Sequence, residues 1–151
     1  MTLKNCPFCN CAEQFIINQS LHFRTIYNIA PILPGHCLVI PKRHVESFFD
    51  LDDKEIAEFM ILGKQTAKLL EKVFKTNSFD WTIQEQIPAG QTILHLHMHI
   101  IPRHSGDLPN PGDWYPLLEK TFYGDNIDAH LRQKLTEEQL EQIVSNLKNE
   151  L

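Results

Sequence analysis

The sequence predicts an α+β fold in which an antiparallel sheet of about five strands packs against one long helix. Two observations indicate this class. Short segments rich in β-branched and aromatic residues follow one another in groups, and two longer segments space their apolar residues three or four positions apart, as amphipathic helices do. A chain that alternated strands with helices would instead favour a parallel, doubly wound sheet. Because the strands come in groups, we expect antiparallel pairing.

The first half of the chain supplies the opening strands of this sheet. Residues 16–28 are rich in strand-forming side chains and predict one or two strands. A turn with two prolines and a glycine follows at 31–35. Residues 36–40 then form a short apolar strand, which we expect to end at Pro41 because proline has no amide hydrogen for the ladder.

A long helix is expected over residues 53–75. Its apolar positions recur every three or four residues from Ile56 to Phe74, which gives one apolar face to pack on the sheet. Asp52 and Glu55 have the spacing of a capping box, with Asp in the usual Ser/Thr role.

The second half of the chain completes the predicted sheet. Strand character returns at 79–84 and at 92–101, and the latter is the most regular strand pattern in the chain, ended by Pro102. Residues 102–116 contain four prolines and two glycines, so we expect a mobile loop there, close to the functional site.

A C-terminal helix is expected over about residues 136–151. Its first residue, Thr136, has Gln139 at the spacing of a capping box. We find no internal repeat or low-complexity tract, so residues 1–151 are predicted to form a single domain with its core at about 6–107.

Charge and hydrophobicity exclude several classes of function. The chain has 14 basic and 19 acidic residues, a formal net charge of −5, which argues against general binding to nucleic acid or to a membrane surface. The longest apolar runs are about four residues, far short of the roughly 20 needed to cross a bilayer. The start has no apolar signal region. We therefore expect a cytoplasmic protein whose four cysteines form no disulfide framework.

Three histidines alternate with large aliphatic residues within the predicted strand at 92–101. Side chains on a strand alternate between its two faces, so these imidazoles are expected to share one face, with aliphatic side chains on the other. The histidines are His95, His97 and His99, and the aliphatic residues are Leu94, Leu96, Met98 and Ile100.

Such a row of imidazoles is compatible with three interpretations. Two histidines on a strand can bind a metal ion, and a neutral imidazole can attack an electrophile and leave again. The third interpretation is a set of hydrogen-bonded or exposed histidines without function. Three neighbouring imidazoles without partners would be costly to bury, which favours the two functional interpretations.

Residues 89–103, read from Ala-Gly-Gln through the three histidines to Pro-Arg, resemble the histidine triad (HIT) signature, His-φ-His-φ-His-φ-φ with φ apolar. The Pro-Gly-His segment within residues 33–44 is similar to the first conserved strand and turn of that family. The resemblance covers roughly residues 6–107. Gln84 and the long loop after the triad make it most similar to the fragile-histidine-triad and diadenosine polyphosphate hydrolase branch.

The resemblance implies a nucleotidyl hydrolase or transferase that acts on dinucleoside polyphosphates or related nucleotide conjugates. His97 would attack the α-phosphorus, and water would release the monophosphate from the nucleotidyl-histidine. His99 would donate to a phosphate or bridging oxygen, and Gln91 would contact the α-phosphate. Both His99 and Gln91 would therefore be catalytic as well as substrate-binding residues.

Three further site residues follow from the resemblance. Gln84 would lie towards the leaving group, Asn28 would bind the nucleoside, and His36 would orient the catalytic groups. Residues 85–87 are Glu-Gln-Ile where the branch usually has Asp-Gly, so the preference for a leaving group does not follow from the resemblance.

Cys6 and Cys9 have the Cys-x₂-Cys spacing of half a zinc site. Similarity to HIT relatives such as galactose-1-phosphate uridylyltransferase-like proteins implies that His44 and His95 complete a structural zinc site. Two alternatives remain open at this point: Cys11 as a substitute ligand, and reduced surface cysteines without a metal.

The resemblance also implies a homodimer with a nucleotide substrate and no nucleic-acid or membrane partner. Related reactions remain alternatives, namely phosphorolysis of diadenosine polyphosphates or hydrolysis of nucleoside phosphoramidates. Two further alternatives are a metalloenzyme that uses all three histidines as ligands and a non-catalytic nucleotide sensor.

Overall fold

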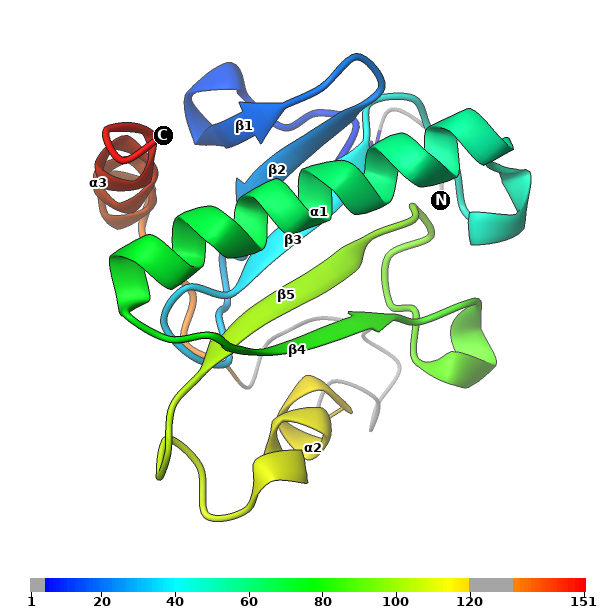
Figure 1. The fold of residues 1–151 in the computed structure, drawn as a ribbon. Coiled ribbons are helices and arrows are strands. Elements are labelled where there is room, and N and C mark those ends of the chain that lie inside the picture. The colour runs from blue at the N-terminus through cyan, green and yellow to red at the C-terminus, as the bar shows by residue number, and fades with distance from the viewer. Residues whose placement is uncertain (1–4, 120–131) are drawn as a thin grey trace.

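Five strands form one antiparallel sheet in the order β1-β2-β3-β5-β4, which confirms the predicted α+β class (Figure 1). The computed structural model describes residues 5–119 and 132–151. Its strands and helices are β1 (Ile16–Gln19), β2 (Phe23–Tyr27), β3 (Cys37–Pro41), α1 (Asp53–Phe74), β4 (Ser78–Ile83), β5 (Met98–Arg103), α2 (Trp114–Glu119) and α3 (Glu137–Lys148).

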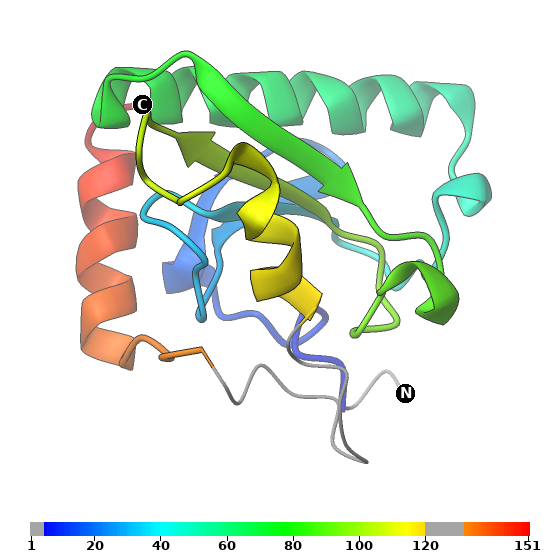
Figure 2. The ribbon, with the colours of Figure 1, turned by 90° about the horizontal axis from the view of Figure 1, so that it is seen from below.

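Helix α1 covers one face of the sheet along its whole length (Figures 1 and 2). Its start is fixed as predicted, because the Asp52 carboxylate accepts from the amides of Lys54 and Glu55, both at 2.9 Å, in a complete capping box. Phe59, on its inner face, is fully buried in the main core. Burial of this apolar face is what holds the helix on the sheet.

Alternation along β3 and β5 divides the apolar side chains between two clusters. Val39 and Met98 belong to the main core with α1, whereas Leu38 and Ile40 belong to a second cluster with Cys6, Phe8, Ile16 and Ile26. The N-terminal segment thus supplies apolar cover on the face of the sheet opposite α1. This second face carries the site described below.

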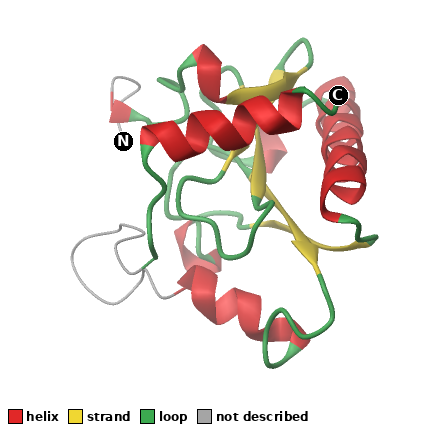
Figure 3. Cartoon of the chain, turned by 90° about the vertical axis from the view of Figure 1, so that its left-hand side faces the viewer, coloured by secondary structure: helices red, strands yellow, loops and turns green. Residues whose placement is uncertain are grey.

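Helix α3, which ends near the C-terminus, packs beside β1 at the edge of the sheet (Figure 3). Thr136 and Gln139 form the predicted capping box, with Thr136 Oγ1 accepting from the Gln139 amide at 3.2 Å. Leu140, Val144 and Leu147 join the main core. Within the described residues, no helix is both long and apolar enough to cross a membrane.

The predicted strand at 92–101 is wrong at both ends. Strand β5 begins only at Met98, because the preceding residues contact a loop instead of another strand: the Leu96 amide donates to the Val45 carbonyl at 2.6 Å. At the other end β5 continues through Pro102 to Arg103. Pro102 lies opposite Phe79 of β4 but beyond the pairing with β3, which ends at Ile100, so it has a neighbouring strand on one side only, as at a sheet edge where proline is tolerated.

The predicted loop at 102–116 also needs correction. Its first two residues belong to β5, a 3-10 turn spans Pro111–Asp113, and α2 begins at Trp114. The Arg103 side chain folds the segment back by donating to Asp80 at 2.5 Å, to Asp107 at 2.8 and 2.9 Å and to the Pro111 carbonyl at 2.7 Å. Ion pairs and a proline-initiated turn therefore replace most of the expected irregular loop.

Candidate active site and metal centre

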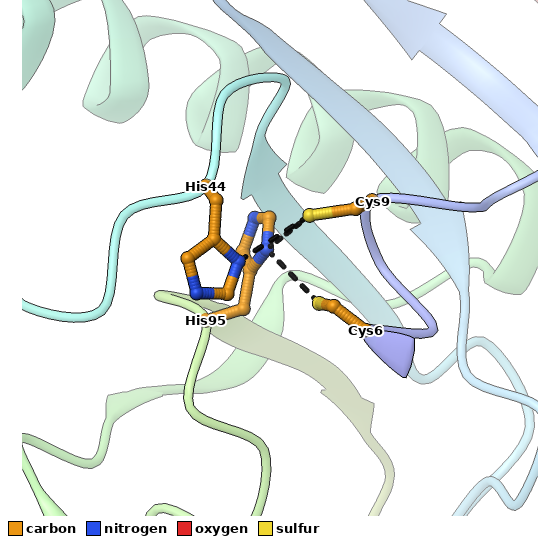
Figure 4. A group of neighbouring side chains, drawn as sticks. All are labelled: Cys6, Cys9, His44 and His95. Carbon is orange, nitrogen blue, oxygen red and sulfur yellow. Dashed lines mark hydrogen bonds between the residues drawn. The ribbon is translucent and has the colours of Figure 1, made fainter. Parts of the chain in front are cut away.

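Four side chains from three segments converge where the N-terminal segment approaches the sheet (Figure 4). Their ligand atoms all lie within 4.8 Å of one another. Cys6 and His95 are fully buried. The four residues are Cys6, Cys9, His44 and His95, the set that the resemblance implied as metal ligands.

The separations in this cluster match those of a tetrahedral metal site. His95 Nδ1 lies 3.4 Å from Cys6 Sγ and 3.5 Å from Cys9 Sγ, and His44 Nδ1 lies 3.3 Å from Cys9 Sγ. A zinc ion with bonds of roughly 2.3 Å to sulfur and 2.0–2.1 Å to nitrogen would hold sulfur and nitrogen about 3.5 Å apart. The residues present therefore fit a four-coordinate metal.

The ring orientations also suit metal binding. His95 Nε2–H donates to the Pro41 carbonyl at 2.9 Å, which leaves the lone pair of Nδ1 facing the two sulfurs. His44 is turned the same way, with Nε2 3.4 Å from a Glu46 carboxylate oxygen. Arg24 Nη2 donates to the Phe8 carbonyl at 2.6 Å and ties the Cys-x₂-Cys turn to β2.

His97 has a different environment although it is only two residues away. Its Nδ1–H donates to the His95 carbonyl at 2.8 Å, so Nε2 is the unprotonated ring nitrogen. Burial lowers the pKa of His97, so the ring is neutral at pH 7. The Phe8 ring contacts it edge-on at 5.3 Å between centroids and belongs to the same cavity wall. A neutral imidazole with a free nitrogen in a partly apolar cavity is a competent nucleophile.

A chain of two hydrogen bonds sets the protonation of His99. The Ile32 amide donates to His36 Nδ1 at 3.2 Å, so the proton of the His36 ring is on Nε2. His36 Nε2–H in turn donates to His99 Nδ1 at 2.8 Å. His99 therefore carries its proton on Nε2, as a hydrogen-bond donor beside His97, with 4.9 Å between the two ring centroids.

His97 and His99 open onto a cavity of about 730 Å³. Asn28 and Gln84 also line it, and their predicted contacts with the nucleoside and the leaving group stay predictions. Asn28 is held through its Oδ1, which accepts from the Ala30 amide at 2.9 Å. Gln84 donates to Thr82 Oγ1 at 3.0 Å. His97, His99, Asn28 and Gln84 are thus brought together on one cavity wall, with His36 directly behind His99.

Gln91 lies outside this cavity lining. Its amide Nε2 donates to the Glu46 carbonyl at 2.8 Å, and its Oε1 accepts from the Gln86 amide at 2.9 Å. In this conformation Gln91 fastens the loop at 84–91 to the segment that carries His44. Its predicted contact with the α-phosphate stays a prediction.

The structure adds polar residues that sequence reasoning missed, among them Arg132, Lys134 and Glu137. Arg132, between the undescribed segment and α3, lines the same cavity as His97. No pattern in the sequence marks it, since it follows no motif and belongs to no helix or strand. Of the three triad histidines, only His95 belongs to the metal-capable group found among residues 5–119 and 132–151.

Comparison with known proteins agrees with this geometry. A family model described as HIT domain matches residues 11–106. The chain is 37% identical over 113 residues to the bis(5'-nucleosyl)-tetraphosphatase [asymmetrical] of Schizosaccharomyces pombe, a match that covers 72% of this chain and 62% of that protein. It is 36% identical over 112 residues to the bis(5'-adenosyl)-triphosphatase of Dictyostelium discoideum, which covers 70% of this chain and 75% of that one.

A solved structure also resembles this chain in its fold. The crystal structure of the C. elegans NitFhit protein has a TM-score of 0.71 and 29% sequence identity, and the match covers 91% of this chain and 27% of that chain. The family match spans more than half of the chain and includes all three triad histidines. The protein therefore belongs to the HIT domain family.

Proposed function

We propose that this protein hydrolyses dinucleoside polyphosphates through a covalent intermediate on His97. The observation that carries the proposal is the tautomer of His97, whose Nδ1 is engaged by a backbone carbonyl so that Nε2 is free beside the His99 donor. The named activities of the S. pombe and D. discoideum relatives support this substrate class.

The geometry is consistent with a two-step displacement. In the first step His97 Nε2 bonds to the α-phosphorus, and the bond from that phosphorus to the bridging oxygen breaks. The leaving nucleoside phosphate takes the electron pair, stabilised by a hydrogen bond from His99 Nε2–H. The positive charge that develops on the His97 ring is stabilised by the Nδ1–H bond to the His95 carbonyl. In the second step water attacks the phosphorus, the N–P bond breaks, and a nucleoside monophosphate leaves with a neutral His97.

Rapid quenching with a radiolabelled substrate tests the covalent step. Diadenosine tetraphosphate labelled at the α-phosphorus should leave acid-labile label on the wild-type protein and none on His97→Asn. A His104→Asn variant is the matched control, because His104 is exposed and bonded to the Phe74 carbonyl outside the cavity. Wild-type turnover without any labelled protein would contradict the proposal.

A substrate panel separates this reaction from its relatives. Diadenosine tri- and tetraphosphate and a nucleoside phosphoramidate are incubated with and without inorganic phosphate, and the products are separated. Release of AMP independent of phosphate supports hydrolysis. A nucleoside diphosphate that forms only with added phosphate would indicate a phosphorylase instead. Preferential cleavage of the phosphoramidate would indicate a different leaving group. Binding without turnover would indicate a nucleotide sensor.

We further propose that Cys6, Cys9, His44 and His95 hold a structural zinc ion. The sulfur-to-nitrogen separations and the His95 tautomer support it. Zinc would lock the N-terminal turn to the segment that presents His97, two residues from His95. Thiolate ligands suit a reducing compartment, in keeping with the expected cytoplasmic location. Metal analysis should find about one zinc per chain, and a metal-free active protein would contradict this part.

The homodimer is also a proposal. Strand β4 is the last strand of the sheet and exposes Trp81 to 39%, and α1 exposes Met60 and Ile61 above it. A sheet edge beside apolar side chains is a suitable pairing surface. Light scattering should give the mass of two chains, and Trp81→Glu should reduce it to one; a wild-type monomer would contradict the proposal.

A further inference from the structure

Arg132 is a cation in the active-site cavity that the proposed chemistry has not yet used. It lines the cavity together with His97, His99 and Gln84. Its Nη1 donates to the Leu117 carbonyl at 3.1 Å, near the end of α2. Its Nε is buried and has no hydrogen-bond partner among the described residues.

The position of Arg132 is fixed from two sides. Three residues later, the Leu135 amide donates to the Ile29 carbonyl at 2.8 Å, which attaches this segment next to Asn28. The bond to Leu117 holds the guanidinium itself. The guanidinium is therefore held by one hydrogen bond to α2, and the backbone three residues later by another to Ile29, which together preorganise Arg132 beside the site.

The charge of Arg132 is felt at the catalytic histidines. Burial lowers the pKa of His36 to about 3, and the positive charge of Arg132 contributes in the same direction. The pKa of His99 is also lowered, first by burial and then by neighbouring positive charge that includes Arg132. The direction of these shifts agrees with the geometry, in which His99 and Arg132 line the same cavity.

Such an arrangement is costly unless an anion completes it. Burial lowers the pKa of Arg132 itself, which reflects incomplete solvation, and it forms no ion pair with a carboxylate in the parts of the chain that the structure describes. A buried polar group without a partner costs about 1–3 kcal/mol. The triad histidines, Asn28 and Gln84 are neutral, and the cavity lining also includes one further cation, Lys134, and one carboxylate, Glu137, so the lining as a whole keeps a positive charge. A dinucleoside polyphosphate carries several negative charges.

We propose that Arg132 binds the anionic phosphate chain of the nucleotide at the His99 side of the cavity. This inference rests on the proposed function, because it assumes a phosphorylated ligand in this cavity. A guanidinium can offer two parallel N–H groups to one phosphate, which gives both affinity and orientation. Arg132 is therefore a substrate-binding residue contributed from outside the triad segment.

Calorimetric titration with AMP and with adenosine tests the inference without relying on turnover. Both ligands carry the same nucleoside, and only AMP carries the phosphate. In Arg132→Gln the affinity for AMP should fall about ten- to hundredfold, the range for loss of a hydrogen bond to a charged group. The affinity for adenosine should change less than about twofold, since the neutral part of the cavity is unaltered. The wild-type affinity for AMP should also fall more steeply with salt than that of the variant.

Two further variants keep the test decisive. Arg132→Lys retains the charge but loses the planar fork, so it should bind AMP with intermediate affinity, and it serves as the test variant if Arg132→Gln does not fold. Arg43→Gln removes one positive charge from an exposed arginine paired with Glu55, far from the cavity lining, and should bind AMP as the wild type does.

The outcomes separate this inference from the proposed function. AMP bound equally by wild type, Arg132→Gln and Arg132→Lys would overturn the role of Arg132 alone. Equal losses for AMP and adenosine would also overturn it, because they would indicate a general change of the cavity. A wild-type protein that binds neither ligand would overturn the proposed function together with this inference.

Discussion

His95 and His97 lie two residues apart, and both are buried against the Phe8 ring, yet the partners of their ring nitrogens differ. Nδ1 of His95 faces two cysteine sulfurs while its Nε2–H is fixed by a carbonyl. Nδ1 of His97 is itself bonded to a carbonyl, and its Nε2 is left free at a cavity. This difference supports the proposed roles, a metal ligand for His95 and a nucleophile for His97.

The two rings therefore differ in which nitrogen carries the proton, Nε2 in His95 and Nδ1 in His97. His99, like His95, carries its proton on Nε2, and here the hydrogen bond from His36 sets that tautomer. The three histidines thus have three different sets of partners, from which we expect three different roles. The predictions below test whether these assignments are separable.

The largest expected effect contrasts His97→Asn with His95→Asn. Removal of the nucleophile should lower turnover of diadenosine tetraphosphate by about 10⁴-fold or more and shift the melting temperature by no more than about 3 °C. His95→Asn should lower both turnover and melting temperature, because it removes a member of the Cys/His cluster. Steady-state kinetics and thermal unfolding measure the two effects; full turnover in His97→Asn would end the distinction.

The next effect concerns the four-residue Cys/His cluster alone. Cys9→Ser should reduce the zinc content from about one per chain to near zero and destabilise the fold by several kcal/mol. At roughly 2–4 °C per kcal/mol for a chain of this size, the melting temperature should fall by about 10 °C. Cys11→Ser is the matched control, because Cys11 lies outside the four-residue cluster. Equal zinc loss in both variants would place Cys11 among the ligands.

A smaller effect is expected from His36, which acts through His99. His36→Phe keeps an aromatic ring but removes the N–H that bonds to His99 Nδ1. We expect a fall in kcat of about ten- to hundredfold with a smaller change in KM. Nitrogen NMR of the His99 ring should show a loss of the single tautomer. An unchanged tautomer together with unchanged kcat would show that His36 only fills space.

The smallest effect concerns the C-terminal end of β5, outside both the Cys/His cluster and the cavity lining. The side-chain hydrogen bond from Arg103 holds the pKa of Asp107 at about 2, below its usual value near 4. A lowered folded-state pKa means that this stability is present above about pH 5 and is lost as the pH falls towards 2. Asp107→Asn should therefore lower the free energy of unfolding by about 1–2 kcal/mol at pH 7. It should also make that free energy depend less on pH between about pH 5 and pH 2.

Chemical denaturation between pH 7 and pH 2.5 measures this dependence. Glu71→Gln serves as the control, because Glu71 forms an exposed pair with Lys68, and such pairs contribute little. If the free energy of unfolding falls equally between pH 7 and pH 2.5 in the wild type and in Asp107→Asn, the Arg103–Asp107 pair is not the source of the acid sensitivity.

Local sequence signals predicted the elements whose causes are local. The capping boxes at Asp52 and Thr136 and the apolar spacing behind them placed α1 and α3 within a residue or two at their starts, because each signal acts within one or two turns. The prediction failed for 92–97, where alternation is typical of a strand. There the backbone hydrogen bond at Leu96 is to Val45, a tertiary contact that no local pattern encodes.

The candidate site divides in the same way. The alternation at 95–99 and the Cys-x₂-Cys spacing identified the residue types, and the family resemblance implied the roles that we propose for them. Only the folded chain showed that the Gln91 amide is bonded to the backbone of Glu46 and Gln86. The fold alone also brought Arg132 to the cavity, from beyond the motif.

The sequence by itself determined which chemistry this protein carries, because imidazoles and thiols at fixed short spacing are a local property of the chain. Tertiary structure decided how that chemistry is used. The groups that fix the His95 and His99 rings, at Pro41 and His36, come from distant parts of the sequence. His97 bonds to the nearby His95 carbonyl, but only the fold places its other nitrogen at the cavity.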